Sequence, residues 1–124
     1  VRHKADEFGI DPDSIGVYGA SAGGHLSLML GTTADEGDPK ASDPVLRESS
    51  RVQAVVALVA PSDIKRAARG APNRLAEYEK FPALNIDQET AATVSPLDFV
   101  TKDDAPTLLI VGDKDTLVPM THSE

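Results

Sequence analysis

Three short apolar runs rich in Val, Ile and Leu constrain the fold of this chain more than any other feature. Polar or helix-forming stretches separate the runs, which span residues 15–19, 52–60 and 107–112. Their apolar residues are nearly continuous and do not alternate with polar ones, which is typical of strands in a parallel sheet with helices on both faces. The pattern therefore predicts three buried parallel strands and an α/β architecture.

Length and charge exclude several classes of protein. The chain has 124 residues without Cys or Trp, which is enough for one globular domain. Its 12 Lys and Arg against 20 Asp and Glu give a formal charge of −8, and no basic cluster suited to phosphate contacts is present. The longest mainly apolar run, residues 52–61, is about half as long as a membrane helix must be. We expect neither a nucleic-acid partner nor a membrane span, while localisation and oligomeric state stay open.

The stretches between the strands have distinct characters. Residues 22–33 are expected to form a helix with Leu26, Met29 and Leu30 on one face. Residues 35–50 are expected to form a polar surface loop whose acids are solvated and bind no cation. In residues 63–95, Gly and Pro interrupt helix formers, which predicts two or three short helices. This excursion is longer than one crossover requires, so we interpret it as a possible cap or pocket wall.

A Gly-x-Ser-x-Gly motif lies at Gly19–Gly23, where the first strand should end and the helix should begin. A sharp turn at such a junction would expose the Ser21 hydroxyl as a nucleophile, and the glycines would let strand and helix approach closely. The Ala22 N–H would lie at the helix N-terminus, where it can stabilise a developing oxyanion. The alternative is a turn of small residues without a catalytic role.

A second polar group, Gly112–Pro119, follows the third strand. Carboxyl ends of parallel strands meet at one sheet edge, so its acids are expected at the same edge as Ser21. We expect Asp115 to be the acid that orients a catalytic histidine, and Asp113 to serve the turn. Two turn aspartates without catalytic function are the alternative.

Four segments together resemble the α/β-hydrolase superfamily, in particular its acetyl-esterase, carboxylesterase and lipase branch, which is close to prolyl oligopeptidase-like domains. In order along the chain they are Asp11–Leu26, Ala60–Asp63, Ser95–Leu97 and Ala105–Pro119. The resemblance implies part of a doubly wound, mainly parallel sheet, with these strands as the fifth to seventh of eight. It assigns the nucleophile to Ser21, the triad acid to Asp115 and one oxyanion-hole donor to Ala22.

The resemblance also implies what this chain does not contain. The family's His-Gly-Gly oxyanion loop has no counterpart here, and family members carry the catalytic histidine after a further strand, beyond Glu124. We therefore expect residues 1–124 to be a partial α/β-hydrolase domain, inactive alone, from a serine hydrolase of small-molecule or carbohydrate esters. It would work through an acyl-enzyme without cofactor or metal. A prolyl oligopeptidase-like serine peptidase and a non-catalytic hydrolase-like binding domain are the alternatives.

The three histidines are not expected to supply the catalytic base. His25 lies one turn into the expected helix, where packing or a hydrogen bond is its expected role. His122 follows Asp115 by seven residues and is expected to be solvated. His3, near the N-terminus, is assigned no role, and no pair of histidines has the spacing of metal ligands.

Overall fold

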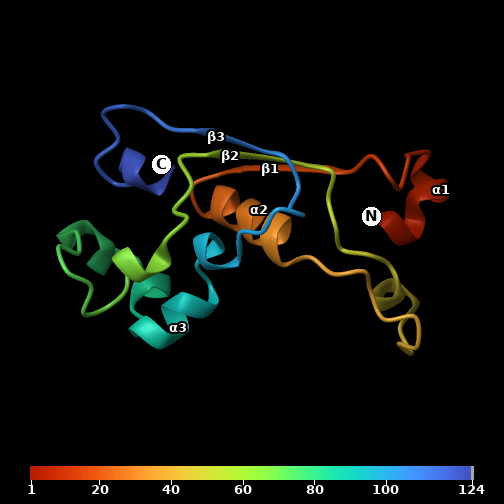
Figure 1. Ribbon diagram of the computed structural model, residues 1–124, viewed down its shortest axis with the longest axis horizontal. Helices are drawn as coiled ribbons and strands as arrows, with labels where there is room; N and C mark the ends of the chain where they lie inside the picture. Colours follow the sequence, from red (N-terminus) through yellow and green to blue (C-terminus); the bar gives the residue numbers. More distant parts are fainter. Residues whose placement is uncertain (124) are drawn as a thin grey trace.

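A three-stranded parallel sheet forms the centre of the structure (Figure 1). The computed structural model describes residues 1–123. The strands are β1 (Gly16–Ala20), β2 (Ala54–Leu58) and β3 (Thr107–Ile110), which lie in the order β1-β2-β3. The α-helices are α1 (Ala5–Phe8), α2 (Ala22–Thr33) and α3 (Gln88–Thr93). The predicted parallel α/β fold is therefore confirmed, and α2 has the predicted boundaries.

The register of the sheet brings the carboxyl ends of all three strands to one level. Ala20 pairs with Leu58, and Leu58 pairs with Ile110. Hydrogen bonds continue the ladder by one residue, because Ser21 N–H donates to Leu58 O at 2.9 Å and Val59 N–H donates to Ile110 O at 2.7 Å. The segments that follow the strands therefore leave the sheet from the same edge.

Helix α2 packs on one face of the sheet, below the strands in Figure 1. Its apolar contact with the sheet centres on Leu28, which is 7% exposed and packs with Val55, Ala57 and Ala60. The predicted helix face is partly wrong, since Leu26 is 68% exposed. Small residues fill the rest of the buried face, and they let the helix axis lie close to the sheet.

The junction between β1 and α2 depends on two glycines. A Cβ at Gly19 would overlap the Gly23 carbonyl and lie 2.9 Å from the Gly24 nitrogen, and one at Gly24 would lie 2.8 Å from the Ala60 Cβ. A Cβ at Gly23, by contrast, would meet no atom within 4 Å. The close approach of strand and helix is therefore confirmed at Gly19, but its second glycine is Gly24 and not Gly23.

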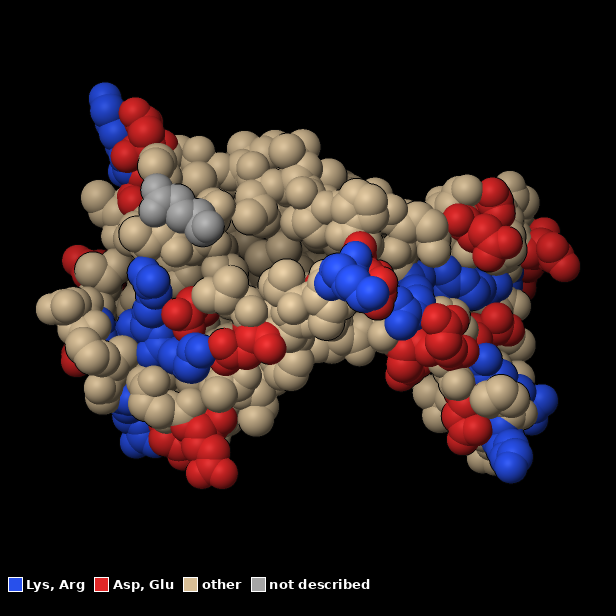
Figure 2. Space-filling model, viewed as in Figure 1, with Lys and Arg blue, Asp and Glu red and all other residues tan. Residues whose placement is uncertain are grey.

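The opposite face of the sheet is open. Tyr18, Val56 and Leu108 are register partners and share this face, where Tyr18 is 81% exposed and Leu108 is also exposed. No helix covers it in the part of the chain that the structure describes. Figure 2 shows a mostly uncharged middle between two charged ends in the same view. The prediction of helices on both faces, and of a buried third strand, is therefore wrong for residues 1–123, because α2 alone reaches the sheet centre.

Residues 63–95 form a lobe of four short helices, where two or three were predicted. Besides α3 it contains the 3-10 helices η3 (Ile64–Arg66), η4 (Ala76–Lys80) and η5 (Pro82–Leu84). A small core of its own holds the lobe together, built on Ile64, Ala68 and Ala91. The lobe lies beside α2 and apart from the loop 35–50 (Figure 1).

The loop 35–50 is irregular apart from the 3-10 helix η2 (Pro44–Arg47), as predicted. Its acids stabilise local turns: Asp35 accepts from Gly37 N–H and Asp43 from Val45 N–H. Among the described residues, His, Asp and Glu side chains form no group of three or more that could hold a metal ion. Within the same residues, no helix combines the length and apolar composition needed to cross a membrane.

Two histidines are packed against other parts of the chain, His25 partly buried and His122 buried. The His25 ring lies against α3, with its Nε2 3.1 Å from Val94 O, which confirms the predicted packed role. His122, in the 3-10 helix η7 (Met120–His122), is 4% exposed, so the prediction of a solvated side chain is wrong. Its Nδ1 accepts from Ser62 N–H and Asp63 N–H, both at 3.3 Å, because η7 folds back under the loop that follows β2.

The glycine geometry predicts opposite effects for two substitutions in one motif. Gly19→Ala should lower the free energy of unfolding of the full-length protein by about 3 kcal/mol or more, because the methyl group meets backbone that cannot move away. Gly23→Ala should leave it unchanged or raise it by up to about 1 kcal/mol, since Ala is the better helix former. Denaturant titration measures both values, and equal losses would contradict this account.

Stability should fall at mildly acidic pH. Burial lowers the pKa of His25. The pKa of His122 is lowered by burial and, to a smaller extent, by the positive charge of Arg66, while the negative charge of Asp63 has a smaller opposing effect. The unfolded chain, with histidine pKa values of about 6.5, then binds protons more readily than the folded protein. The stability that the two uncharged histidines contribute is complete above about pH 6.5, and it is lost as the pH falls through their lowered pKa values in the folded protein.

Melting temperatures of the full-length protein, measured between about pH 7.5 and about pH 5, should show this loss. The doubly substituted protein His25→Asn, His122→Asn should lose less stability over the same range, whereas the exposed-site control His3→Asn should behave like the wild type. Parallel curves for all three proteins would refute the assignment.

Candidate active site

Ser21 occupies a sharp turn between β1 and α2. Its backbone has φ 52° and ψ −120°, a left-handed value of φ that residues other than glycine rarely adopt. The backbone is held there by the bond from Ser21 N–H to Leu58 O and by the bond from His25 N–H to Ser21 O, both 2.9 Å. The side chain is exposed and makes no hydrogen bond within the described residues. The serine is therefore presented to solvent at the carboxyl edge of the sheet, as predicted for the motif.

The Ala22 N–H lies in the first turn of α2 and has no hydrogen-bond acceptor among the described residues. First-turn N–H groups of a helix lack partners inside the helix, and they carry the positive end of the helix dipole. Ala22 immediately follows Ser21, so this free donor lies beside the serine. The position is suited to binding an oxygen that becomes negatively charged next to Ser21.

Asp115 lies in the irregular stretch after β3. Its Oδ1 accepts from Leu117 N–H at 2.9 Å and from Val118 N–H at 2.8 Å, while Oδ2 accepts no hydrogen bond from the described residues. The carboxylate is half-buried, whereas Asp113 is exposed and makes no such bond. We expected Asp113 to stabilise this turn, but Asp115 does so. Its carboxylate accepts from the N–H groups two and three residues further along the chain, which is a common way for an aspartate to stabilise a turn.

The structure brings Ser21 and Asp115 to the same edge of the sheet and separates them by the end of β2. No hydrogen bond joins them within the described residues. Between them lies Val59, whose φ of 44° is a further outlier at this edge. Nothing in the sequence predicts a positive φ at a β-branched residue, so this feature was not expected. Backbone strain of this kind is often found at functional sites.

Sequence reasoning also missed Tyr78. This side chain is 5% exposed, and its hydroxyl donates to Leu117 O at 2.7 Å, next to the Asp115 turn. Burial first, and the negative charge of Asp115 second, raise the pKa of Tyr78, so the hydroxyl stays protonated and remains a donor. Nothing in the local sequence connects residue 78 with residue 117.

The histidines described by the structure have partners other than Ser21 and Asp115. His25 contacts Val94 O and His122 accepts from the loop after β2. His3 lies 3.4 Å from Glu48 in the N-terminal region. No histidine among residues 1–123 is therefore bonded in the way a catalytic base requires.

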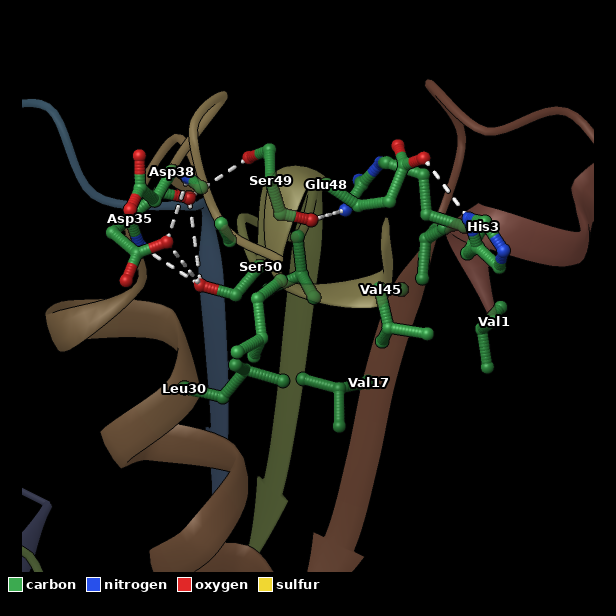
Figure 3. Close-up of a pocket in the computed structure, with 17 residues that line it drawn as sticks. Val1, His3, Val17, Leu30, Asp35, Asp38, Val45, Glu48, Ser49 and Ser50 are labelled. Atoms are coloured by element: carbon green, nitrogen blue, oxygen red, sulfur yellow. Dashed lines mark hydrogen bonds and ion pairs between the residues drawn. The ribbon is translucent and has the colours of Figure 1, made fainter. Parts of the chain in front are cut away.

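A pocket lies at the opposite, amino-terminal end of the strands (Figure 3). Val17 and Leu30 point toward each other at its base, and Asp35, Ser49 and Ser50 lie at its rim. It is lined by the start of β1 and the end of α2, whereas Ser21 lies at the end of β1 and the start of α2. This pocket is therefore separate from the edge that carries Ser21 and Asp115.

Comparisons with known proteins show the family to which this chain belongs. The BD-FAE family model matches residues 1–124. Esterase LipC of Mycobacterium tuberculosis is 34% identical over 130 residues, which cover 99% of this chain and 31% of LipC.

Two solved structures share the fold over nearly the whole chain. An acetyl ester-xyloside bifunctional hydrolase from Caldicellulosiruptor lactoaceticus matches with TM-score 0.84 and 36% identity, over 99% of this chain and 43% of that one. A truncated carbohydrate esterase from gut microbiota matches with TM-score 0.76 and 34% identity, over 99% of this chain and 48% of that one. The chain thus spans about a third of the curated relative and less than half of each solved structure. It belongs to the BD-FAE family and has an α/β-hydrolase type of fold.

Proposed function

We propose that this chain carries the nucleophile and the acid of a serine hydrolase that cleaves carboxylic esters through an acyl-enzyme. The observation that carries the proposal is the backbone of Ser21, which is strained, exposed and placed at the junction of β1 and α2. A strained turn of this kind at the start of a helix is the mechanical basis of the nucleophile elbow. Glycine would adopt this backbone without strain, so a turn of small residues without a catalytic role gives no reason for a serine at this position.

In the proposed reaction the Ser21 hydroxyl attacks the ester carbonyl, and a histidine beyond Glu124 accepts its proton. The Ala22 N–H donates to the oxyanion, an interaction worth about 2.7 to 4 kcal/mol of transition-state stabilisation in a comparable site. Asp115 accepts from the histidine through its free Oδ2 and stabilises the imidazolium. The histidine then protonates the leaving alcohol, and water hydrolyses the acyl-enzyme to the free acid and Ser21.

The relatives favour carbohydrate esters within this class. LipC is named as an esterase, and the two solved structures are named as an acetyl ester-xyloside hydrolase and a carbohydrate esterase. A sugar ester would present its acyl group to Ser21, with the lobe 63–95 as a wall of the substrate site. The same elbow would also serve a serine peptidase, and a non-catalytic binding domain could retain it. An acetylated xylan oligomer and a peptide amide, compared as substrates, separate the three.

Ser21→Ala in the full-length protein should lower kcat for a short acyl ester by about 10⁴-fold or more, because no other nucleophile can take its place. Ser42→Ala is a matched control, since Ser42 is exposed and makes no hydrogen bond within the described residues. A fluorophosphonate probe should modify the peptide containing Ser21 in the wild type and in the control only. Wild-type turnover by the Ser21→Ala protein would disprove the nucleophile.

The 124-residue chain by itself should show no measurable ester turnover. Loss of a triad histidine costs about 10⁶-fold in kcat where it has been measured in a serine hydrolase. The assay compares the chain with the full-length protein at equal concentration on p-nitrophenyl acetate. If the 124-residue chain hydrolyses the ester faster than the same chain with Ser21→Ala, the need for a histidine beyond Glu124 is contradicted. If the full-length protein is inactive, the non-catalytic binding domain is favoured.

A further inference from the structure

The stretch that carries Asp115 has little regular structure of its own. Between β3 and η7 its internal hydrogen bonds are those of turns, namely Asp115 N–H to Gly112 O, the two bonds to Asp115 Oδ1, and His122 N–H to Pro119 O. Turn bonds determine the shape of a short segment, but they do not determine where the segment lies relative to the sheet. Its position beside the strand ends must come from contacts with other parts of the chain.

Tyr78 provides the first of these contacts. Its side chain belongs to η4 in the lobe 63–95 and is almost completely buried. The hydroxyl donates to Leu117 O at 2.7 Å, and the N–H of the same Leu117 donates to Asp115 Oδ1 at 2.9 Å. One peptide-bonded residue therefore lies between the tyrosine hydroxyl and the carboxylate.

His122 provides the second contact, at the other end of the stretch. Its Nδ1 accepts from Ser62 and Asp63, and Ser62 Oγ–H donates to His122 O at 2.6 Å. Residues 62–63 belong to the segment that leads from β2 into the lobe, so these three bonds attach the end of the stretch to that segment. Val118, buried between the two contacts, adds apolar packing.

We propose that Tyr78 and His122 are positioning residues for Asp115, which hold its carboxylate in place from the lobe and from the segment that follows β2. The inference rests on the proposed function, in which Asp115 is the triad acid. It assigns part of the lobe 63–95 a role in catalysis through Asp115, in addition to any contact with substrate. A displacement of about 1 Å can cost on the order of 100-fold in rate, so anchors without substrate contact should affect kcat.

The tyrosine arm of the test uses the two tyrosines of the chain. Tyr78→Phe in the full-length protein removes one hydroxyl and keeps the buried ring, and it should lower kcat about 10-fold with KM nearly unchanged. Tyr18→Phe is the matched control, since the Tyr18 side chain is exposed and its hydroxyl makes no hydrogen bond within the described residues; its kcat should equal the wild-type value. Equal kcat values for wild type and Tyr78→Phe would overturn the role of Tyr78.

The histidine arm uses the position of the acceptor atom. An Asn side chain places its carboxamide oxygen near the position of Nδ1, whereas Gln places it near that of Nε2. His122→Asn should therefore keep kcat within about 3-fold of the wild type, and His122→Gln should lower it about 10- to 100-fold. Rescue by Asn and not by Gln would support the anchor, and equal kcat values for the two variants would overturn it.

A double-mutant cycle separates an effect through Asp115 from a general effect on the fold. In an Asp115→Asn background, Tyr78→Phe and His122→Gln should lower kcat less than about 2-fold further, because the carboxylate that they position is gone. Full, multiplicative losses in that background would overturn the proposal. If Asp115→Asn itself leaves kcat unchanged, the proposed function fails first. If His122→Gln does not fold, as circular dichroism would show, the Tyr78→Phe cycle decides.

Discussion

The close approach of α2 to the sheet is the constraint on which the rest of the structure depends. A Cβ on Gly31 would lie 2.7 Å from Val55 Cγ2, and one on Gly24 would lie 2.8 Å from Ala60 Cβ and 3.1 Å from Leu58 O. Both ends of the helix therefore pack closely against β2 and the residues that follow it. Helix α2 begins two residues after the end of β1 and runs back along the sheet at this short distance. Only one residue is therefore available to reverse the direction of the chain. Ser21 is that residue, and its left-handed φ is the consequence.

Strain at the carboxyl edge is compensated by the ladder that precedes it. Left-handed backbone at Ser21 and Val59 costs on the order of 1–3 kcal/mol per residue. The N–H groups of both residues donate to the neighbouring strand, to Leu58 and Ile110 respectively, so the last pairs of the sheet hold the strained residues in place. The parallel register thus supports two unusual conformations side by side, at the edge where the proposed chemistry takes place.

The two proposed catalytic groups are held by different means. Ser21 lies on rigid elements, between a strand and a helix, whereas Asp115 lies on a stretch of turns that depends on Tyr78 and His122. In this arrangement the lobe 63–95 and the loop after β2 determine the position of the acid. The burial of His122, with its Nδ1 turned to two N–H donors, fits an uncharged acceptor and leaves it unsuited to moving protons.

The sequence by itself determined the three strands, their parallel arrangement, the boundaries of α2 and the position of Ser21 at a strand–helix junction. These features follow from local patterns: apolar runs, helix propensity and a motif of five residues. The tertiary structure decided which side of α2 is buried, so that Leu28 and not Leu26 contacts the sheet, and that Gly24 and not Gly23 allows the close approach. It alone brought Tyr78 to Leu117 and His122 to Ser62, because contacts between residues 39 and 60 positions apart depend on how the elements pack and leave no pattern in the local sequence.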